Sequence, residues 1–173
     1  KEGFECVGVN MKLYTADIVE EGCKTCCSLD DSEDARSVAF RLGIPFYVFN
    51  SKAEFEEKVI RKFISCYECG ATPNPCIECN RHLKFDHFLR KALVLGCDYI
   101  VTGHYARIRQ DPETGRYLLH RAADDSKDQS YFLAGLTQEQ LAHIHFPLGE
   151  LTKEQAREIA ENQGFLNARK KDS

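Results

Sequence analysis

The chain has 173 residues, of which 43% are hydrophobic and 29% are charged, and its formal net charge is −4 at pH 7. These values are ordinary for a globular protein with one main domain. No apolar run approaches the length of a membrane span and no signal peptide is visible, so we expect a cytoplasmic protein without a membrane partner. The negative charge gives no global support for a nucleic-acid partner, so such a contact has to depend on local basic patches.

The first half of the chain alternates apolar and amphipathic segments. A compact apolar run at its start is typical of a buried parallel strand, and Gly43 closes an amphipathic helix. Phe55, Val59 and Phe63 recur every four residues and indicate another helix. The expected elements are a strand at 4–11, a helix from 31 or 32 to 42, a strand at 45–50 and a helix at 53–64.

The second half predicts a further strand and then changes character. An apolar stripe from Leu83 to Leu93 indicates a helix ended by Gly96, and residues 99–105 read as a strand. Short links between these elements predict an α/β layer fold, with strands 4–11, 45–49 and 99–102 parallel in one sheet. A hairpin (106–110 and 116–121) and short helices after Thr137-x-x-Gln140 and Thr152-x-x-Gln155 should follow.

Nine cysteines make thiol chemistry the next question. Their odd number, the α/β alternation and the Cys-x-x-Cys grouping favour a reducing compartment over a secreted disulfide scaffold. Cys23, Cys26 and Cys27 lie in a polar, irregular stretch, which is either a zinc pair or a loop that orders only with its partner.

The central stretch, 71–85, carries the densest pattern, Ala-Thr-Pro-Asn-Pro-Cys-Ile-Glu-Cys-Asn-Arg-His-Leu-Lys-Phe. Pro73 and Pro75 predict an extended segment around Asn74, with a helix starting only at Asn80. Two thiols beside a helix N-terminus predict a reactive sulfur site. The main rival is a zinc-stapled RNA-binding module, in which Cys66-x-x-Cys69 and Cys76-x-x-Cys79 form a four-cysteine knuckle.

Several other residues allow two interpretations each. Met11 ends a strand, where α/β sheets place ligands, but a core methionine has the same pattern. Gly103 follows a strand and lets a ligand approach the backbone closely. His104 is either a general base or a histidine bonded into the turn. Two basic groups are either RNA contacts or solvated faces: Arg81, Lys84, Arg90 and Lys91 form one, and Arg107, Arg109, Arg116 and Arg121 form the other.

Four motifs, GVNMK, TPNPCIECN with its LKF tail, TGHYARI and KDQSYFL, stand in the order in which they occur in the tRNA-specific 2-thiouridylases, which the chain resembles. A fifth, KKDS, is similar to the start of a longer family element. The resemblance implies a Rossmann-like parallel sheet of the N-type ATP-pyrophosphatase kind. It also implies that ATP with Mg²⁺ activates the wobble uridine, and that a sulfur-relay or cysteine desulfurase protein delivers sulfur as a persulfide.

The resemblance also assigns roles by position. Met11 and Gly103 would contact the adenine nucleotide, and Asn74, Pro75 and Cys76 would meet the target base of the tRNA. Lys127, Asp128 and Gln129 would touch the tRNA elsewhere. Cys79 would be the first catalytic cysteine, with Cys76 beside it in the catalytic loop. Many family members have Asp in place of Cys76, so Cys76 and Cys79 are also candidate ligands of an iron–sulfur cluster.

The same resemblance predicts how the chain is divided. We expect residues 1–107 to form the ATP-pyrophosphatase core and residues 108–173 to form a tRNA-contacting extension. The family's phosphate loop should precede Lys1, and its second catalytic cysteine should follow Ser173, so these 173 residues alone should be inactive. A different ATP-pyrophosphatase, one that adenylates a small molecule, is the alternative within enzymes; KDQSYFL and the NPCIEC loop disfavour it.

Overall fold

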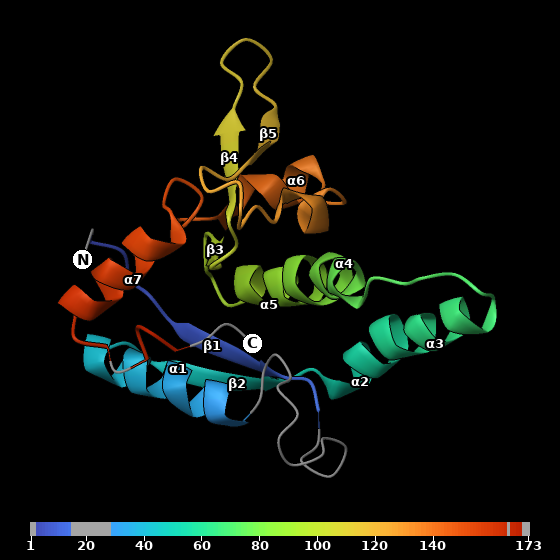
Figure 1. Ribbon diagram of the computed structural model, residues 1–173, viewed down its shortest axis with the longest axis horizontal. Helices are drawn as coiled ribbons and strands as arrows, with labels where there is room; N and C mark the ends of the chain where they lie inside the picture. Colours follow the sequence, from blue (N-terminus) through green and yellow to red (C-terminus); the bar gives the residue numbers. More distant parts are fainter. Residues whose placement is uncertain (1–2, 15–28, 166, 171–173) are drawn as a thin grey trace.

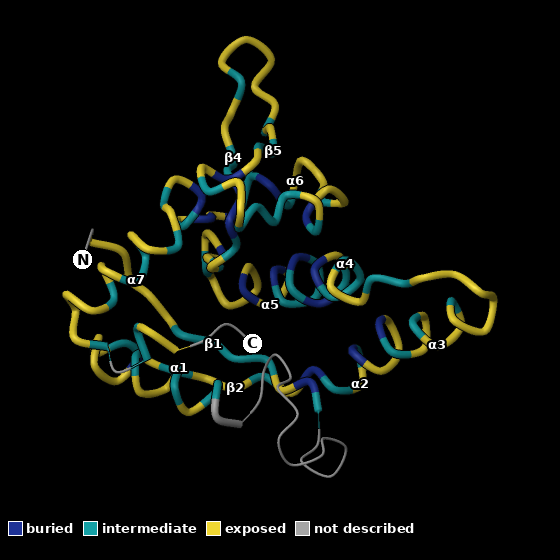
Figure 2. Tube along the Cα trace, in the orientation of Figure 1, coloured by how far each residue is buried: buried dark blue, intermediate teal, exposed yellow. Residues whose placement is uncertain are grey.

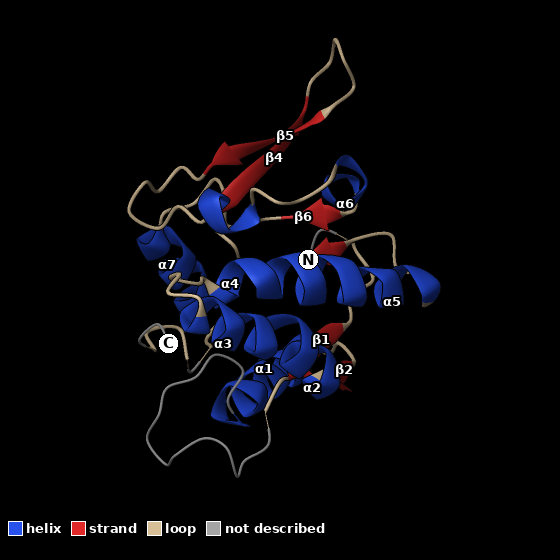
Figure 3. Cartoon of the chain, turned by 90° about the vertical axis from the view of Figure 1, so that its right-hand side faces the viewer, coloured by secondary structure: helices blue, strands red, loops and turns tan. Residues whose placement is uncertain are grey.

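The computed structural model describes residues 3–14, 29–165 and 167–170, and arranges them on both sides of one long helix (Figure 1). This helix consists of α4 (Pro75–Glu78), η3 (Cys79–Phe88) and α5 (Leu89–Val94). Its middle part, η3, has π-helical winding, which is rare and frequent at functional sites. In Figures 1 and 3 the helix lies between two separate pairs of parallel strands.

The first pair joins β1 (Gly8–Lys12) and β2 (Phe46–Asn50), with Met11 opposite Phe49. Helix α1 (Leu29–Leu42) lies beside this pair and ends at Gly43, whose φ of 70° is one that glycine adopts without strain. The prediction of a parallel strand, helix and strand is confirmed. The first strand is shorter than expected, because it starts at Gly8 and not at Phe4.

A second helical run connects β2 to the long helix. It consists of α2 (Lys52–Phe55), η2 (Glu56–Ile60) and α3 (Arg61–Glu68), and therefore extends past the expected end at Ile64. Phe55 and Val59 are buried, as their four-residue spacing predicted. Gly70, with a φ of 74°, follows the last helical turn and ends the run.

The second parallel pair joins β3 (Ile100–Val101) to β6 (Ile144–His145). The prediction that β3 lies in one sheet with β1 and β2 is therefore wrong for the described residues. Ile100 N–H donates to the carbonyl of His143 and Thr102 N–H to that of His145, so the partner of β3 comes from later in the chain. A two-residue strand such as β6 is too short to show the period of two that would have predicted it.

The remaining elements follow the local signals closely. The antiparallel hairpin of β4 (Ala106–Gln110) and β5 (Tyr117–Arg121) is confirmed and extends away from the other elements (Figure 1). Both predicted capping boxes are present, at Thr137 and at Thr152. They begin α6 (Gln138–Ala142) and α7 (Lys153–Asn162), and a 3₁₀ turn, η4 (Ser130–Leu133), precedes them.

Two apolar clusters hold these parts together, and both include the long helix (Figure 2). We call the smaller one the β1 core; it consists of Leu13, Phe55, Val59 and Leu83. We call the larger one the β3 core; it consists of Phe85, Leu89, Ala92, Ile100, Ala106, Leu133, Ile144 and Phe146. The β3 core takes residues from both sides of position 107, where we expect the division of the chain.

Within the described ranges, no helix combines the length and the apolar character needed to cross a membrane.

Candidate active site

The long helix begins earlier than the two prolines predicted. Asn74 is extended, as expected, with φ −115° and ψ 100°, but Pro75 is the first helical residue. The expectation that the helix starts only at Asn80 is wrong, because a proline at the first position lacks only an N–H that has no partner in the helix anyway. Asn74 Oδ1 accepts the N–H of Cys76 at 3.1 Å, which caps the helix. Cys76 and Cys79 therefore both lie on the first turns of the helix.

The two cysteines are three residues apart, so they lie on neighbouring positions of one helix face. Neither forms a disulfide; Cys76 is exposed and Cys79 is half-buried. The positive end of the helix dipole is located at this turn and favours negative charge. This arrangement suits a pair of sulfur atoms that react with, or bind, a common partner.

Glu78, between the cysteines, anchors this turn to the neighbouring helix α3. Lys62 Nζ lies 2.7 Å from one carboxylate oxygen and His82 Nε2 lies 3.2 Å from the other. Burial raises the pKa of Glu78, but the hydrogen bond and charge of Lys62 outweigh it, so this pKa lies below its usual value. The sequence interpretation missed this cluster; the only local signal for it is the four-residue spacing of Glu78 and His82.

Met11 and Cys79 contact the same apolar cluster although they lie far apart in sequence. Both pack against the β1 core, to which the helix contributes Leu83, a fully buried residue one turn beyond Cys79. The structure thus places the expected nucleotide contact and the expected catalytic cysteine beside the same apolar cluster.

Gly103 and His104 follow β3 at the β3 core. Gly103 is exposed, and a Cβ added there would meet only Leu148 at 3.6 Å, an ordinary contact. His104 Nδ1 lies 2.7 Å from Thr102 Oγ1, which supports the interpretation of a histidine bonded into the turn. Burial, together with the charge of Lys84, lowers the pKa of His104 to about 4, so its imidazole is neutral at pH 7.

The segment of Lys127, Asp128 and Gln129 lies against this same turn. Gln129 Oε1 accepts the N–H of Tyr105 at 2.9 Å, and the N–H of Gln129 donates to the carbonyl of Tyr105 at 2.8 Å. The expected tRNA-contacting segment is therefore bonded to the loop that contains the expected nucleotide contact, Gly103.

The zinc knuckle is not formed. The rival interpretation, in which Cys66 and Cys69 join Cys76 and Cys79, is not supported, because no group of three or more Cys, His, Asp or Glu in the described part of the chain could hold a metal ion. α3 carries the first two thiols away from the start of α4 (Figure 1). Cys76 and Cys79 can offer two thiolates to an iron–sulfur cluster, and no third ligand gathers with them within the described ranges. Cys23, Cys26 and Cys27 lie outside these ranges.

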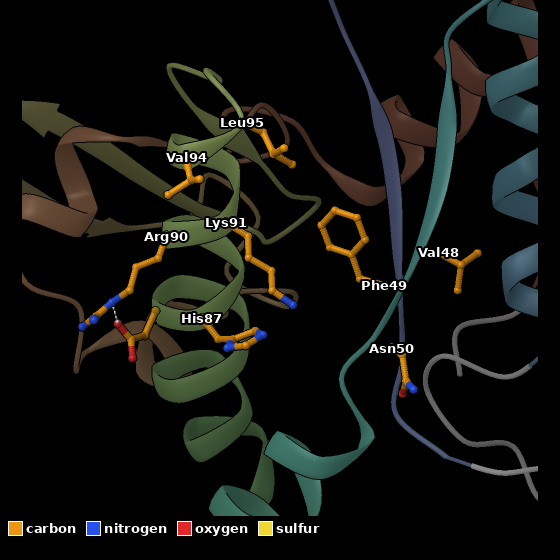
Figure 4. Close-up of a pocket in the computed structure, with 9 residues that line it drawn as sticks. Val48, Phe49, Asn50, His87, Arg90, Lys91, Val94 and Leu95 are labelled. Atoms are coloured by element: carbon orange, nitrogen blue, oxygen red, sulfur yellow. Dashed lines mark hydrogen bonds and ion pairs between the residues drawn. The ribbon is translucent and has the colours of Figure 1, made fainter.

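A cavity of about 620 Å³ lies between β2 and the long helix and contains none of the residues to which the resemblance assigns a role (Figure 4). Its charged groups have partners: Arg90 pairs with Asp86 at 2.6 Å, and Lys91 Nζ lies 5.6 Å from the ring centre of Phe49. We assign it no part in the chemistry. It is lined by Val48, Phe49, Asn50, Asp86, His87, Arg90, Lys91, Val94 and Leu95.

Comparison with known proteins finds similarity along the whole chain. A family model described as the tRNA methyl transferase HUP domain matches residues 1–173. Proteins named tRNA-specific 2-thiouridylase MnmA are similar along the whole chain: that of Clostridioides difficile strain 630 is 53% identical over 173 residues, which are 48% of its length. Those of Symbiobacterium thermophilum and Solibacter usitatus are 52% and 51% identical, over 46% and 48% of their lengths. The chain thus spans about half the length of the curated relatives it matches.

Proposed function

Because the chain belongs to the tRNA methyl transferase HUP domain family, we propose that it is the catalytic core of a tRNA-uridine 2-sulfurtransferase with a Rossmann-like fold of the ATP-pyrophosphatase kind. The relatives that match its full length are named tRNA-specific 2-thiouridylases. The observation that carries the proposal is the helix turn capped by Asn74, which presents Cys76 and Cys79 beside the cluster that Met11 contacts.

In this proposal the nucleotide is bound between Met11 and Gly103. Gly103 is exposed and has no side chain, so a ligand can approach its backbone closely. ATP, with Mg²⁺, supplies an AMP group to the C2 oxygen of the uridine and releases pyrophosphate, which turns a poor leaving group into a good one. The neutral imidazole of His104 adds no positive charge to this end of the site.

Cys79 has the role of a thiol nucleophile in the sulfur-transfer step. A sulfur-relay or cysteine desulfurase protein provides the sulfur as a persulfide on a second cysteine, which we place outside this chain. The Cys79 thiolate attacks the inner sulfur of that persulfide, forms a disulfide and releases the outer sulfur as hydrosulfide. The hydrosulfide attacks C2 and expels AMP with the C2 oxygen, and a dithiol reductant then restores the two cysteines.

The tRNA is proposed to lie over Asn74, Pro75 and Cys76 at the target base and along residues 127–129. Residues 1–107 would then supply the nucleotide and sulfur chemistry, and residues 108–173 most of the remaining tRNA contact. If Cys76 and Cys79 bind an iron–sulfur cluster, thiolate is the ligand type that such clusters use, and the remaining ligands have to come from outside the described residues.

The test uses the full-length enzyme, ATP, a persulfide donor and unmodified tRNA. Replacing Cys79 by Ser should abolish 2-thiouridine, measured by mass spectrometry of digested tRNA, because Ser cannot perform the thiol exchange. Cys69→Ser is the matched control, since Cys69 likewise forms no disulfide but lies at the end of α3, and it should retain activity. Normal thiolation by the Cys79→Ser variant would contradict the proposed role.

A further inference from the structure

Gln129 ties two loops of the site together through the backbone. Its side-chain oxygen and its own N–H exchange two hydrogen bonds with Tyr105, 24 positions earlier in the chain. Tyr105 is only 6% exposed, so its N–H has no easy access to water as an alternative partner. The Gln129 side-chain oxygen is therefore engaged in holding the backbone directly after Gly103 and His104.

Asp128 is engaged in the same way at the base of the hairpin. Its Oδ1 accepts the N–H of Ala122 at 2.9 Å, and its Oδ2 accepts the hydroxyl of Ser130 at 2.8 Å. Arg121 lies 3.5 Å away, and the Asp128 side chain is only 14% exposed. Burial raises the pKa of Asp128, but these hydrogen bonds outweigh it and the pKa is lowered, so the group is an anion at pH 7.

The segment continues from Gln129 directly to the helix of the cysteines. Phe132 N–H donates to the Gln129 carbonyl at 3.0 Å, and Asn80 Nδ2 donates to the carbonyl of Phe132 at 3.2 Å. Asn80 directly follows Cys79 and is only 4% exposed. On the next residue, the guanidinium of Arg81 lies against Gly135, where an added Cβ would come within 2.9 Å of it.

From these contacts we propose that Asp128 and Gln129 are positioning residues: they affect the reaction through their hydrogen bonds to the protein backbone and not by touching a substrate. They hold residues 128–132 as a connector between the loop of Gly103 and the helix turn of Cys79, with Asn80 as its contact on the helix. The identity of the two connected sites rests on the proposed function. This proposal gives Gln129 a different role from the one expected from the sequence. Instead of contacting tRNA, its side chain holds the loop of Gly103 in place relative to the helix turn of Cys79.

Two substitutions of Gln129 in the full-length enzyme test this role. Gln129→Glu keeps a side-chain oxygen for the N–H of Tyr105, whereas Gln129→Met has a similar size and removes it. We expect hydrogen exchange of the Tyr105 amide to stay slow in Gln129→Glu. It should be about tenfold faster or more in Gln129→Met, because an unsatisfied buried N–H costs roughly 1–3 kcal/mol.

The kinetic constants for thiolation should also differ between Gln129→Met and Gln129→Glu. Gln129→Met should lower kcat for thiolation by about tenfold, the effect of roughly 1.4 kcal/mol, with the KM for tRNA within about twofold of the wild type. Gln129→Glu should have a higher kcat than Gln129→Met, because it keeps the acceptor for the N–H of Tyr105. A side chain that bound RNA directly would give the opposite result: the added negative charge of Gln129→Glu would raise the KM for tRNA, and Tyr105 exchange would be unchanged in both variants. That result would overturn the proposal.

Hydrogen exchange of the Tyr105 amide does not depend on catalysis. It therefore tests the connector even if the wild type proves inactive and the proposed function fails. If Gln129→Met does not fold, Asp128→Asn and Asp128→Ala replace it as the decisive pair. Asp128→Asn keeps the acceptor for the N–H of Ala122, so it should keep Ala122 protected from exchange and have a higher kcat than Asp128→Ala. Asp128→Ala should lose the protection of Ala122. Equal kcat and equal Ala122 exchange in these two variants would contradict the positioning role.

Discussion

Asn74 and Cys76 form the hydrogen bond that begins the long helix, with the Asn74 side-chain oxygen accepting the Cys76 N–H at 3.1 Å. Asn74 holds the extended geometry of a helix cap, and Pro75 occupies the first helical position. The amide of Asn74 thus has a structural task in addition to the contact with the target base that we propose for it. The two roles can be separated, because capping needs only an acceptor oxygen.

Asn74→Ala should reduce the free energy of unfolding by about 1 kcal/mol, the usual cost of losing a helix cap. Asn74→Asp retains an acceptor oxygen and should be nearly as stable as the wild type. Urea unfolding followed by circular dichroism measures both. If thiolation also falls in Asn74→Asp, whose cap is intact, the amide acts on the base as well; equal stability of all three proteins would rule out the cap.

Cys76→Asp distinguishes plain thiol chemistry from an iron–sulfur cluster. The resemblance implies that many family members have Asp at this position, so an enzyme that only exchanges sulfur should keep its activity with this substitution. An enzyme with a cluster should lose both iron and activity, because a thiolate ligand is lost. The thiol exchange proposed for Cys79 predicts the first outcome, and a cluster bound by Cys76 and Cys79 predicts the second. The measurement is iron content and thiolation of anaerobically reconstituted full-length enzyme; a fully active, metal-free wild type would exclude the cluster.

His104 should make stability depend on pH between about 4 and 6.5. Its folded-state pKa is lowered to about 4 by burial and by Lys84, from an ordinary value of 6.5, so the unfolded chain binds the proton more readily. The stability associated with the neutral imidazole is complete above pH 6.5 and is lost as the pH falls toward 4.

The cost of lowering the pH from 7 to 5 should be about 2 kcal/mol from this residue. Urea unfolding at the two pH values measures it, with His104→Gln as the comparison, because glutamine is neutral throughout and can still bond to Thr102. The wild type should lose more stability than this variant over the interval. An equal loss in both proteins would show that His104 titrates normally.

Gly103→Val should weaken nucleotide binding without disturbing the fold. Gly103 does not have a positive φ, and an added Cβ meets only Leu148 at an ordinary distance, so the backbone accepts a side chain here without strain. The branched side chain would occupy the space through which we propose the nucleotide approaches. We expect an unchanged melting temperature and at least about a tenfold weaker affinity for ATP, which corresponds to about 1.4 kcal/mol, by calorimetry on the full-length enzyme. Unchanged affinity would place the nucleotide elsewhere.

Local signals in the sequence predicted local structure well. The Asp111–Gly115 turn and the two capping boxes need only neighbouring residues, and all are present in the structure. The start of the long helix was wrong because Pro75 can either prevent a helix or begin one, and the capping bond from Asn74 decides between them. The partner of β3 was wrong because pairing is set by packing over long separations, which a two-residue strand does not reveal.

In the candidate site, too, the sequence predicted local features and missed contacts between distant segments. The proximity of Cys76 and Cys79 follows from their spacing alone. That Met11 and Cys79 share the β1 core, and that Asn80 bonds to Phe132, depends on contacts between distant segments. No periodicity or spacing reports such contacts, so the sequence could suggest which residues carry the chemistry but not which residues hold them in place.

The long helix contributes Leu83 to the β1 core and Phe85, two residues later, to the β3 core, and both side chains are fully buried. Inserting or deleting one residue between them would turn one side chain away from its cluster by roughly 100°. Evolution can therefore lengthen or shorten the hairpin loop around Asp111–Gly115, which is exposed, far more readily than the segment that follows Cys79. The spacing from Leu83 to Phe85 is therefore fixed by the two clusters, whatever side chain lies between them.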